Sequence, residues 1–212
     1  MLIEQLQEEL TAGLGELMPG PADPDRVTVL LDYLQLLVRW NKTYNLTAIR
    51  DPHQMITRHL LDSLAVLPWI GEGPLLDAGT GAGLPGIPLA IMQPQLNVTL
   101  LDSTGKKVRF LNHVVRELKM DRVQPVQARL ETWSGEPQPR SIISRAFSTV
   151  GEFARSSRHL AVAGTRLLAM KGKRPDAELK DVPACWQIDS IEQLQVPGLQ
   201  EERHLVMMSF IR

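Results

Sequence analysis

The sequence predicts an α/β protein: a mostly parallel, seven-stranded sheet with crossover helices, preceded by an all-helical segment. From about residue 71 onward, short apolar runs alternate with helical stretches, a pattern typical of parallel strands joined by right-handed crossovers. Before that point the apolar residues recur at helical spacing. The last two apolar runs are joined by Val196-Pro197-Gly198-Leu199, which favours an antiparallel hairpin at the end of the sheet.

The helical segment is expected to cover residues 1–70. Leucines at positions 2, 6, 10, 14 and 17 form one stripe. Asp23-Pro24 then marks the start of a second helix, because Asp caps helices and Pro suits the first helical position, and Asp51-Pro52 repeats that signal. The polar, aromatic stretch from Trp40 to Thr47 is expected to connect these two helices. We therefore expect a helical extension, residues 1–70, packed on a core domain of residues 71–212.

Within the core domain, each element follows from a short apolar run or from a helical stripe. Strands are expected at residues 75–78, 98–102, 123–127, 142–144, 167–170, 186–194 and 204–211. Helices are expected at residues 84–92, 106–119 and 149–160.

The composition is that of an ordinary globular protein. Of the 212 residues, 43% are hydrophobic and 22% are charged, which argues against collagen, coiled coil and intrinsic disorder. No apolar run approaches the roughly 18–20 residues that span a bilayer, and residues 1–25 carry no Lys or Arg for a secretory signal. The single cysteine, Cys185, excludes an internal disulfide and a cysteine-based zinc site. We expect a cytoplasmic protein without a membrane segment.

The net charge of −1 hides an asymmetry along the chain. Residues 1–25 contain six acids and no base, so the remainder carries 23 bases against 24 − 6 = 18 acids. Residues 140–174 hold eight bases and one acid, and residues 102–129 hold seven bases and three acids. This distribution fits a polyanion partner, although solvated helix faces would explain it about as well.

A glycine-rich turn follows the first strand of the core domain. Gly79, Gly81 and Gly83 alternate between that strand and the next helix, where glycine permits positive φ and lets a ligand approach the main chain. The carboxyl end of the first strand is where open α/β sheets bind ligands. A ligand cradle and a tight structural turn are both consistent with the spacing.

Two acids favour a particular ligand. Asp77 stands just before Gly79, where a carboxylate disfavours a pyrophosphate and suits the sulfonium and amino groups of S-adenosylmethionine. Asp102 ends the second strand, where an acid can accept both ribose hydroxyls. Because NAD also has a ribose, Asp102 leaves the cofactor open, and Asp77 favours the methyl donor.

Three further residues follow neighbouring strands. Leu130 and Glu131 come after the third strand and would sit beside an adenine, although a capping or solvated role for Glu131 is equally consistent. Arg145 follows the fourth strand and faces the expected pocket, where it would bind an anion or the ribose side of the ligand. A structural ion pair is the other interpretation of Arg145.

Motifs along most of the chain resemble the RsmG (GidB) family of bacterial 16S ribosomal RNA guanine-N7 methyltransferases. The matching stretches are Trp40-Asn41-Lys42-x-Tyr44-Asn45-Leu46-Thr47, Arg58-His59-x-Leu61-Asp62-Ser63, Asp77-x-Gly79-Thr80-Gly81-x-Gly83-Leu84-Pro85-Gly86-Ile87-Pro88-Leu89, Leu100-Leu101-Asp102-Ser103, Lys106-x-x-Arg109-Phe110-Leu111, Ile143-Ser144-Arg145-Ala146-Phe147 and Lys171-Gly172.

The resemblance implies a class I S-adenosylmethionine-dependent methyltransferase fold and a guanine in the decoding region of small-subunit rRNA as acceptor. It also implies a set of cofactor contacts. Carried over by position, these are Gly79, Leu84, Leu130, Glu131 and Arg145, with Asp102 on the ribose, beside Asp77 and Gly81 from the turn itself. Guanine N7 carries no proton and has an in-plane lone pair, so we expect neither a catalytic base nor a metal.

The expected partner is 16S rRNA in the small subunit or a precursor, bound by a monomer. Phosphate contacts are expected from basic residues and base stacking from aromatic ones, although Trp40 and Tyr44 would equally suit a helix–sheet interface. The candidates are Arg58, Lys106, Arg109, Lys171, Lys173 and Arg174 for phosphates, and Trp40, Tyr44 or Phe147 for a base. His59 is expected to be packed rather than to carry protons. A nucleotide-dependent oxidoreductase and a non-catalytic RNA-binding assembly factor are the rival functions.

Overall fold

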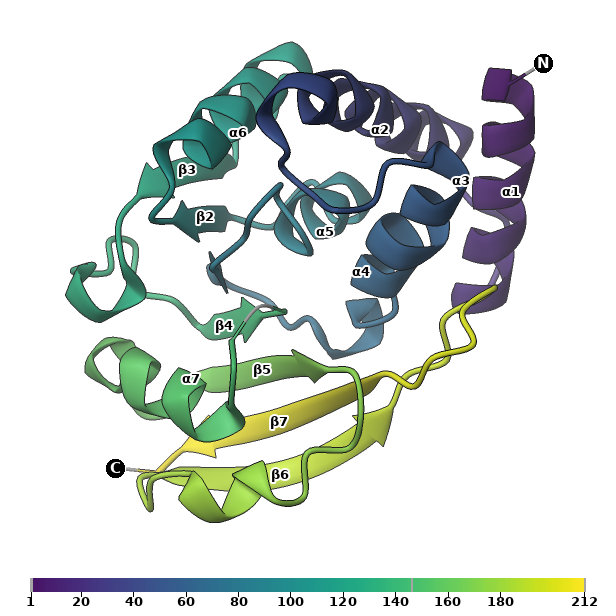
Figure 1. Cartoon of the computed structure of the whole chain (residues 1–212). Helices are drawn as coiled ribbons and strands as arrows, with labels where there is room; N and C mark the ends of the chain where they lie inside the picture. The colour runs from purple at the N-terminus through teal and green to yellow at the C-terminus, as the bar shows by residue number, and fades with distance from the viewer. Residues whose placement is uncertain (1, 146, 212) are drawn as a thin grey trace.

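A computed structural model describes residues 2–145 and 147–211. It shows a seven-stranded sheet in the order β3-β2-β1-β4-β5-β7-β6, with helices on both faces (Figure 1). The strands are β1 (Leu75–Ala78), β2 (Val98–Asp102), β3 (Val123–Gln127), β4 (Ser141–Ser144), β5 (Arg166–Lys171), β6 (Trp186–Gln193) and β7 (His204–Phe210).

The strand pairing follows the predicted pattern. β1 lies parallel between β2 and β4, β3 extends this sheet beyond β2, and β5 extends it beyond β4. β7 runs antiparallel to both β5 and β6, and the pairing of β6 with β7 shifts register between Ile188 and Ser190. The prediction of a mostly parallel sheet with a C-terminal antiparallel hairpin is confirmed.

The helices begin with a long pair and continue with short, irregular pieces. The first part of the chain forms α1 (Leu2–Leu17), α2 (Pro24–Tyr44), α3 (Pro52–Met55), the π-helix η1 (Ile56–Leu61), α4 (Asp62–Leu64) and the 3₁₀ turn η2 (Leu67–Trp69). The crossovers hold α5 (Gly86–Met92), α6 (Gly105–Glu117), α7 (Val150–Ser157) and the 3₁₀ turns η3 (Leu130–Thr132), η4 (Arg158–Leu160) and η5 (Glu178–Asp181).

The predicted connector from Trp40 to Thr47 is wrong in its first half, because α2 continues to Tyr44. The helix ends at Asn45, which adopts a left-handed conformation with φ of 47°, a role that Asn fills more readily than most residues. Asn41 then fixes the chain beyond the helix: its side chain donates to Ile49 O and accepts from the Thr47 N–H. The polar residues of this stretch therefore end a helix instead of interrupting it.

The other boundaries differ by a few residues for local reasons. The helix expected at residues 84–92 begins at Gly86, because Leu84 donates to Thr80 O within the glycine turn. The helix expected at residues 149–160 ends at Ser157 and tightens into η4. The helix after Asp51 passes through the π-helix η1, a wide turn that is often found at functional sites.

Alternate residues along the buried strands supply two separate layers of the core. Leu75, Ile143 and Leu168 face the helices α1 to α6 and join their core cluster. Leu76, Ile142 and Leu167 face the opposite layer, which contains Phe153 of α7. The sheet is therefore covered on both faces, which explains why its central strands read as continuous apolar runs.

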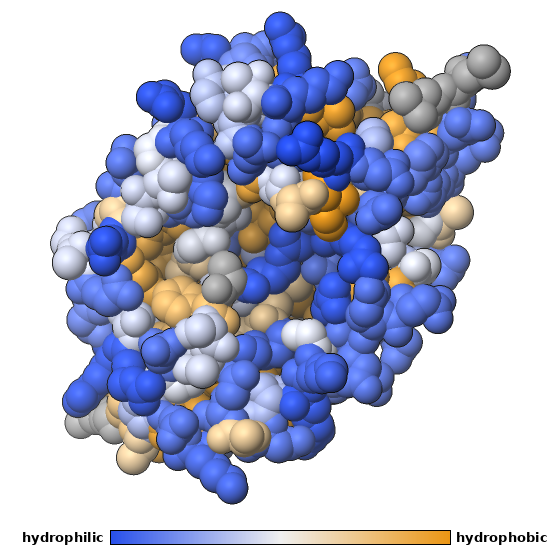
Figure 2. Space-filling view, in the orientation of Figure 1, coloured by the Kyte–Doolittle hydropathy of each residue, from blue (hydrophilic) through white to orange (hydrophobic). Residues whose placement is uncertain are grey.

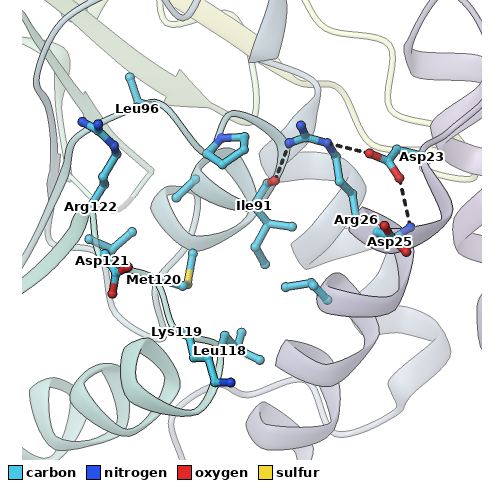
Figure 3. A pocket seen from close by; sticks show the side chains of 14 residues that line it. Asp23, Asp25, Arg26, Ile91, Leu96, Leu118, Lys119, Met120, Asp121 and Arg122 are labelled. Atoms are coloured by element: carbon cyan, nitrogen blue, oxygen red, sulfur yellow. Dashed lines mark hydrogen bonds and ion pairs between the residues drawn. The ribbon is translucent and has the colours of Figure 1, made fainter.

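The N-terminal helices share the first of these layers. α1 packs on η1, and α2 packs on α5 and α6. At one edge Arg26 of α2 donates to the carbonyl oxygens of Ile91 (2.8 Å) and Met92 (2.6 Å), so it caps the end of α5 (Figure 3). Among residues 2–145 and 147–211, no helix has the length and apolarity to cross a membrane.

Two glycines of α1 allow the packing of this helix to be measured. A Cβ on Gly13 would collide with Leu61 of η1, whereas a Cβ on Gly15 would meet no atom within 4 Å. Both Ala substitutions gain about 0.5–1 kcal/mol of helix propensity, but Gly13→Ala also overpacks the interface at a cost of roughly 1–3 kcal/mol. We expect Gly15→Ala to raise the free energy of unfolding above that of wild type. The free energy of unfolding of Gly13→Ala should be lower than that of Gly15→Ala by the overpacking cost, as measured by urea denaturation. Equal stabilities would show that the Leu61 side chain moves aside for the added methyl group at no measurable cost.

Candidate cofactor site

The buried carboxylate of Asp77 organises the loop that follows β1. Its Oδ2 accepts hydrogen bonds from Thr80 Oγ1 (2.6 Å) and from the Gly86 N–H (2.7 Å). These bonds join the end of β1 to both ends of the glycine turn, and the side chain is completely buried. Asp77 therefore shapes the loop from below.

Close approach explains one glycine of this loop, and backbone conformation explains another. A Cβ on Gly86 would collide with Leu100 and stand 2.8 Å from the bound Oδ2 of Asp77. Gly81 has φ of 64° and is half-buried, so its main chain is open to a ligand. The loop therefore combines a rigid base with an accessible main chain.

Asp102, at the end of β2, closes the other side of this loop. Its Oδ2 accepts from the Gly81 N–H (3.0 Å) and from Lys107 Nζ (3.2 Å), and its Oδ1 accepts from the Thr104 N–H (2.8 Å). A carboxylate has about four acceptor positions, and these bonds use three of them. Oδ1 accepts one hydrogen bond and can therefore accept a second, from one hydroxyl of a ribose.

The environment of Asp77 changes its acidity. Burial raises the pKa of the Asp77 carboxyl from 3.8 to about 6, and the hydrogen bonds from Thr80 and Gly86 and the charge of Arg145 oppose this shift. Its Oδ1 is buried without a hydrogen-bond partner among the described residues. An unpaired buried acceptor is costly, and it is the kind of group that a bound donor satisfies.

Arg145 comes directly after β4 and binds the π-helix. Its Nη1 donates to Arg58 O (3.1 Å) and to Asp62 Oδ2 (3.1 Å), and its side chain remains 25% exposed. Asp62 is 2% exposed, and its Oδ1 accepts from Arg203 Nε at 2.8 Å. The structure therefore shows the structural ion pair that was the second interpretation of Arg145, beside the candidate cofactor site.

The other predicted contacts lie around the same sheet edge. Leu84 and Leu130 are buried, and Leu130 belongs to the core cluster that contains Ala78 and Leu101. Glu131 is exposed, and its Oε1 accepts from Ser156 of α7 at 3.2 Å. Because β1 to β4 are adjacent and parallel, the segments that follow them meet at one edge, with Glu131 at its periphery.

Three polar residues that support the site were missed in the sequence. Tyr33 of α2 is fully buried and donates to Ala82 O in the glycine turn at 2.8 Å. Ser144 donates to Ala78 O at 2.7 Å, and Lys107 binds Asp102 as described above. Tyr33 lies on the buried stripe of α2, and a buried Tyr needs a polar partner, so its position carried a signal that spacing alone did not reveal.

The aromatic candidates for base stacking are partly committed to packing. Trp40 of α2 lies 5.5 Å from Phe110 and 5.2 Å from His113, both on α6, measured between ring centroids. Tyr44 stacks beside Trp40 and is 39% exposed. Trp40 thus packs between α2 and α6, a helix–helix interface in place of the helix–sheet interface that was its second interpretation, and Tyr44 presents a face to solvent.

His59 is packed as expected. Its Nε2 lies 2.8 Å from Thr47 Oγ1 and its Nδ1 lies 3.0 Å from Arg58 O. Burial and then the charge of Arg145 lower the pKa of His59 to about 4. The ring is therefore neutral at neutral pH, which suits a structural role.

Several of the predicted basic residues already have polar partners. Lys106 donates to Tyr44 O at 2.8 Å, Lys171 pairs with Glu178 at 3.0 Å, and Arg174 pairs with Asp176. Figure 2 shows hydrophilic side chains gathered around hydrophobic ones at the hollowed centre of this face. Over the described part of the chain, no group of three His, Cys, Asp or Glu side chains is arranged to hold a metal ion.

Comparison with known proteins identifies the family. The family model for rRNA small subunit methyltransferase G matches residues 26–206. The chain belongs to this family. It is 49% identical over 210 residues to the ribosomal RNA small subunit methyltransferase G of Stutzerimonas stutzeri, covering 98% of this chain and 97% of the relative. It is also 49% identical over 207 residues to the protein of that name from Pseudomonas fluorescens, covering 96% of this chain and 95% of the relative.

Solved structures with low sequence identity share the fold. Pyrococcus horikoshii TYW2 in complex with MeSAdo has a TM-score of 0.58 and 14% identity over 73% of this chain and 63% of that one. A putative tRNA (m1A22) methyltransferase from Streptococcus pneumoniae has a TM-score of 0.55 and 18% identity over 68% of this chain and 67% of that one. The expected family and the expected fold are thus confirmed.

The raised pKa of Asp77 predicts the direction in which the stability of the protein changes with pH. The folded chain holds this proton up to about pH 6, whereas an unfolded carboxyl releases it near 3.8, so the contribution of Asp77 to stability falls as pH rises through that window. Asp77→Asn keeps the shape and lacks this titration. Its free energy of unfolding should therefore rise relative to wild type by roughly 3 kcal/mol across the window, at about 1.4 kcal/mol per pKa unit.

The measurement is urea denaturation of both proteins at several pH values. The depressed pKa of His59, about 4, makes stability rise with pH between that value and 6.5. Both proteins share this opposite slope, so the difference between their curves isolates Asp77. A difference in unfolding free energy between the two proteins that does not change with pH would show that Asp77 is not desolvated.

Proposed function

We propose that this chain transfers a methyl group from S-adenosylmethionine to N7 of a guanine in the decoding region of small-subunit 16S rRNA. The glycine loop held between Asp77 and Asp102 is the observation that carries the proposal, since it offers a main-chain cradle between two acids. We further propose that residues 1–70 are an extension on a methyltransferase domain of residues 71–212. The chain acts as a monomer in the cytoplasm, where its rRNA substrate is found.

The residues around the loop fit the donor. The half-buried main chain of Gly79 and Gly81 receives its adenosyl and methionine parts, and Asp102 accepts a ribose hydroxyl on Oδ1. The buried Oδ1 of Asp77, which has no partner in the described structure, is assigned to the amino group of the methionine part. Leu130 and Glu131 lie toward the adenine, and Arg145 at the mouth separates the donor from the acceptor.

The chemistry needs position more than proton transfer. When bound, S-adenosylmethionine supplies an electrophilic methyl group on a sulfonium. Guanine N7 already carries an in-plane lone pair and no proton, so this chain has no proton to remove before the bond forms. Holding the two reactants in line supplies much of the rate. This agrees with a site in which His59 is neutral and bonded on both ring nitrogens.

The direct experiment is methyl mapping. Small subunits from a strain that lacks the protein are incubated with the purified chain and labelled S-adenosylmethionine, and the modified nucleotide is located in the 16S rRNA. We expect one labelled guanine, modified at N7, in the decoding region. Label at another base or atom would refute the acceptor, and binding without incorporation would favour a non-catalytic assembly factor. Sedimentation of the active protein measures its oligomeric state.

Asp102 gives a matched test of the cofactor site. Asp102→Asn removes the charge that strengthens its hydrogen bonds, so we expect the Kd for S-adenosylhomocysteine to rise by about tenfold to a hundredfold in calorimetry. Asp121→Asn is the control, because Asp121 is an exposed acid at the opposite, amino-terminal edge of the sheet (Figure 3). An unchanged Kd for the Asp102 variant, with its fold intact by circular dichroism, would contradict the ribose assignment.

A further inference from the structure

A hollow of about 350 Å³ lies beside the cofactor site, at the carboxyl ends of β4 and β5. The η1 helix forms one wall of this hollow, and the start of β7 with the residue before it forms another. Arg145 lines it and also belongs to the cofactor site, so the two spaces adjoin. Its size is at the lower end of the range for small-ligand pockets, enough for part of a nucleotide.

The lining of this hollow is strongly basic. Arg58, Arg145, Lys171 and Arg203 face a single acid, Asp62. Asp62 is 2% exposed and uses one oxygen for Arg145 and the other for Arg203, so one negative charge is shared by two guanidinium groups. The pair of arginines therefore keeps a net positive charge in a partly buried place, where it attracts an anion strongly.

The arginines are also held in position. Arg203 Nη1 donates to Glu202 O at 2.8 Å while its Nε is fixed on Asp62, and its side chain is 20% exposed. Arg145 is held by Asp62 and by Arg58 O, a carbonyl on the π-helix. Guanidinium groups fixed in advance lose little entropy when they bind an anion.

The outer cations have partners that an anion can replace. Arg58 pairs with Glu201, and the two side chains are 37% and 49% exposed, so their attraction is weak in water. Lys171 is 15% exposed and is bound more firmly, to Glu178 and to Ser148 O. Arg58 is therefore the movable cation of the rim, and Arg203 is the fixed one.

We propose that this hollow binds a backbone phosphate next to the acceptor guanine, with Arg203 and Arg58 as its ligands and Asp62 as the positioning residue. The proposal rests on the RNA methyl transfer proposed above. A planar guanidinium matches phosphate oxygens in geometry as well as charge. No Phe, Tyr or Trp of the described chain lines the hollow, and the His59 and His204 rings in its lining are buried, so charged groups and not exposed aromatic faces dominate it. The phosphate is thus held beside the donor, while the base turns toward the methyl group.

The test compares Arg203→Gln and Arg58→Gln with Arg122→Gln. Arg122 is an exposed arginine at the opposite edge of the sheet and serves as the control (Figure 3). The Kd for small subunits from a strain lacking the protein is measured with S-adenosylhomocysteine present, at several KCl concentrations. We expect each variant of the hollow to bind about tenfold more weakly and its salt slope to fall by about 0.7, the value for one lost phosphate contact on a single strand. A purely structural ion pair would not change that slope.

The affinity for S-adenosylhomocysteine separates the two anions that the hollow can bind. Under the proposal it stays unchanged in Arg58→Gln, because the anion is a phosphate of the RNA and the Arg58 side chain pairs with the exposed Glu201. A loss of cofactor affinity with unchanged subunit binding would assign the hollow to the methionine carboxylate and overturn the proposal. Unchanged subunit affinity and slope in both variants would also overturn it.

Two controls keep the result interpretable. If Arg203→Gln fails to fold, Arg58→Gln carries the test, because its ion pair is exposed and its loss costs little stability. Methyl mapping with wild-type protein tests the proposed function separately. If the wild-type protein methylates the subunit and both variants bind the subunit normally, the phosphate site is refuted and the proposed function stands.

Discussion

The buried carboxylate of Asp77 is the constraint on which the site depends. One oxygen accepts from Thr80 and from the main chain of Gly86, so β1, the glycine turn and α5 meet at a single atom. Withdrawing a carboxylate from water is costly, and these donors offset only part of that cost, as the raised pKa of about 6 shows. The same group that costs stability thus fixes the loop that we propose to face the cofactor.

A second buried acid joins the helical extension to the sheet. Asp62 follows the π-helix and binds Arg145 after β4 and Arg203 before β7, three segments that are far apart in the chain. Removing one partner of such a cluster leaves an uncompensated charge, so the three groups depend on one another. The extension therefore does more than cover an apolar face: it supplies the counter-charge that orients basic side chains beside the cofactor site.

The meeting of the candidate site residues could be predicted from the sequence, but their contacts could not. Asp77, Gly81 and Asp102 meet at the carboxyl edge of the sheet because β1 and β2 are adjacent and parallel. The roles of their atoms were beyond prediction, since Asp77 binds Thr80 and Gly86 beneath the loop. Lys107 was also missed, because its bond to Asp102 depends on how the start of α6 turns over β2.

The sequence by itself determined the α/β class, the strand positions and the family, because periodicity, glycine placement and local motifs are properties of neighbouring residues. Tertiary structure alone decided the charge network. Arg203 and Asp62 are 141 residues apart, and no local pattern records that they pair. The extent of α2 depended likewise on Asn41 bonding beyond the helix. Long-range pairing is fixed by the packing of whole elements, and that packing is what places four cations and one acid around a single hollow.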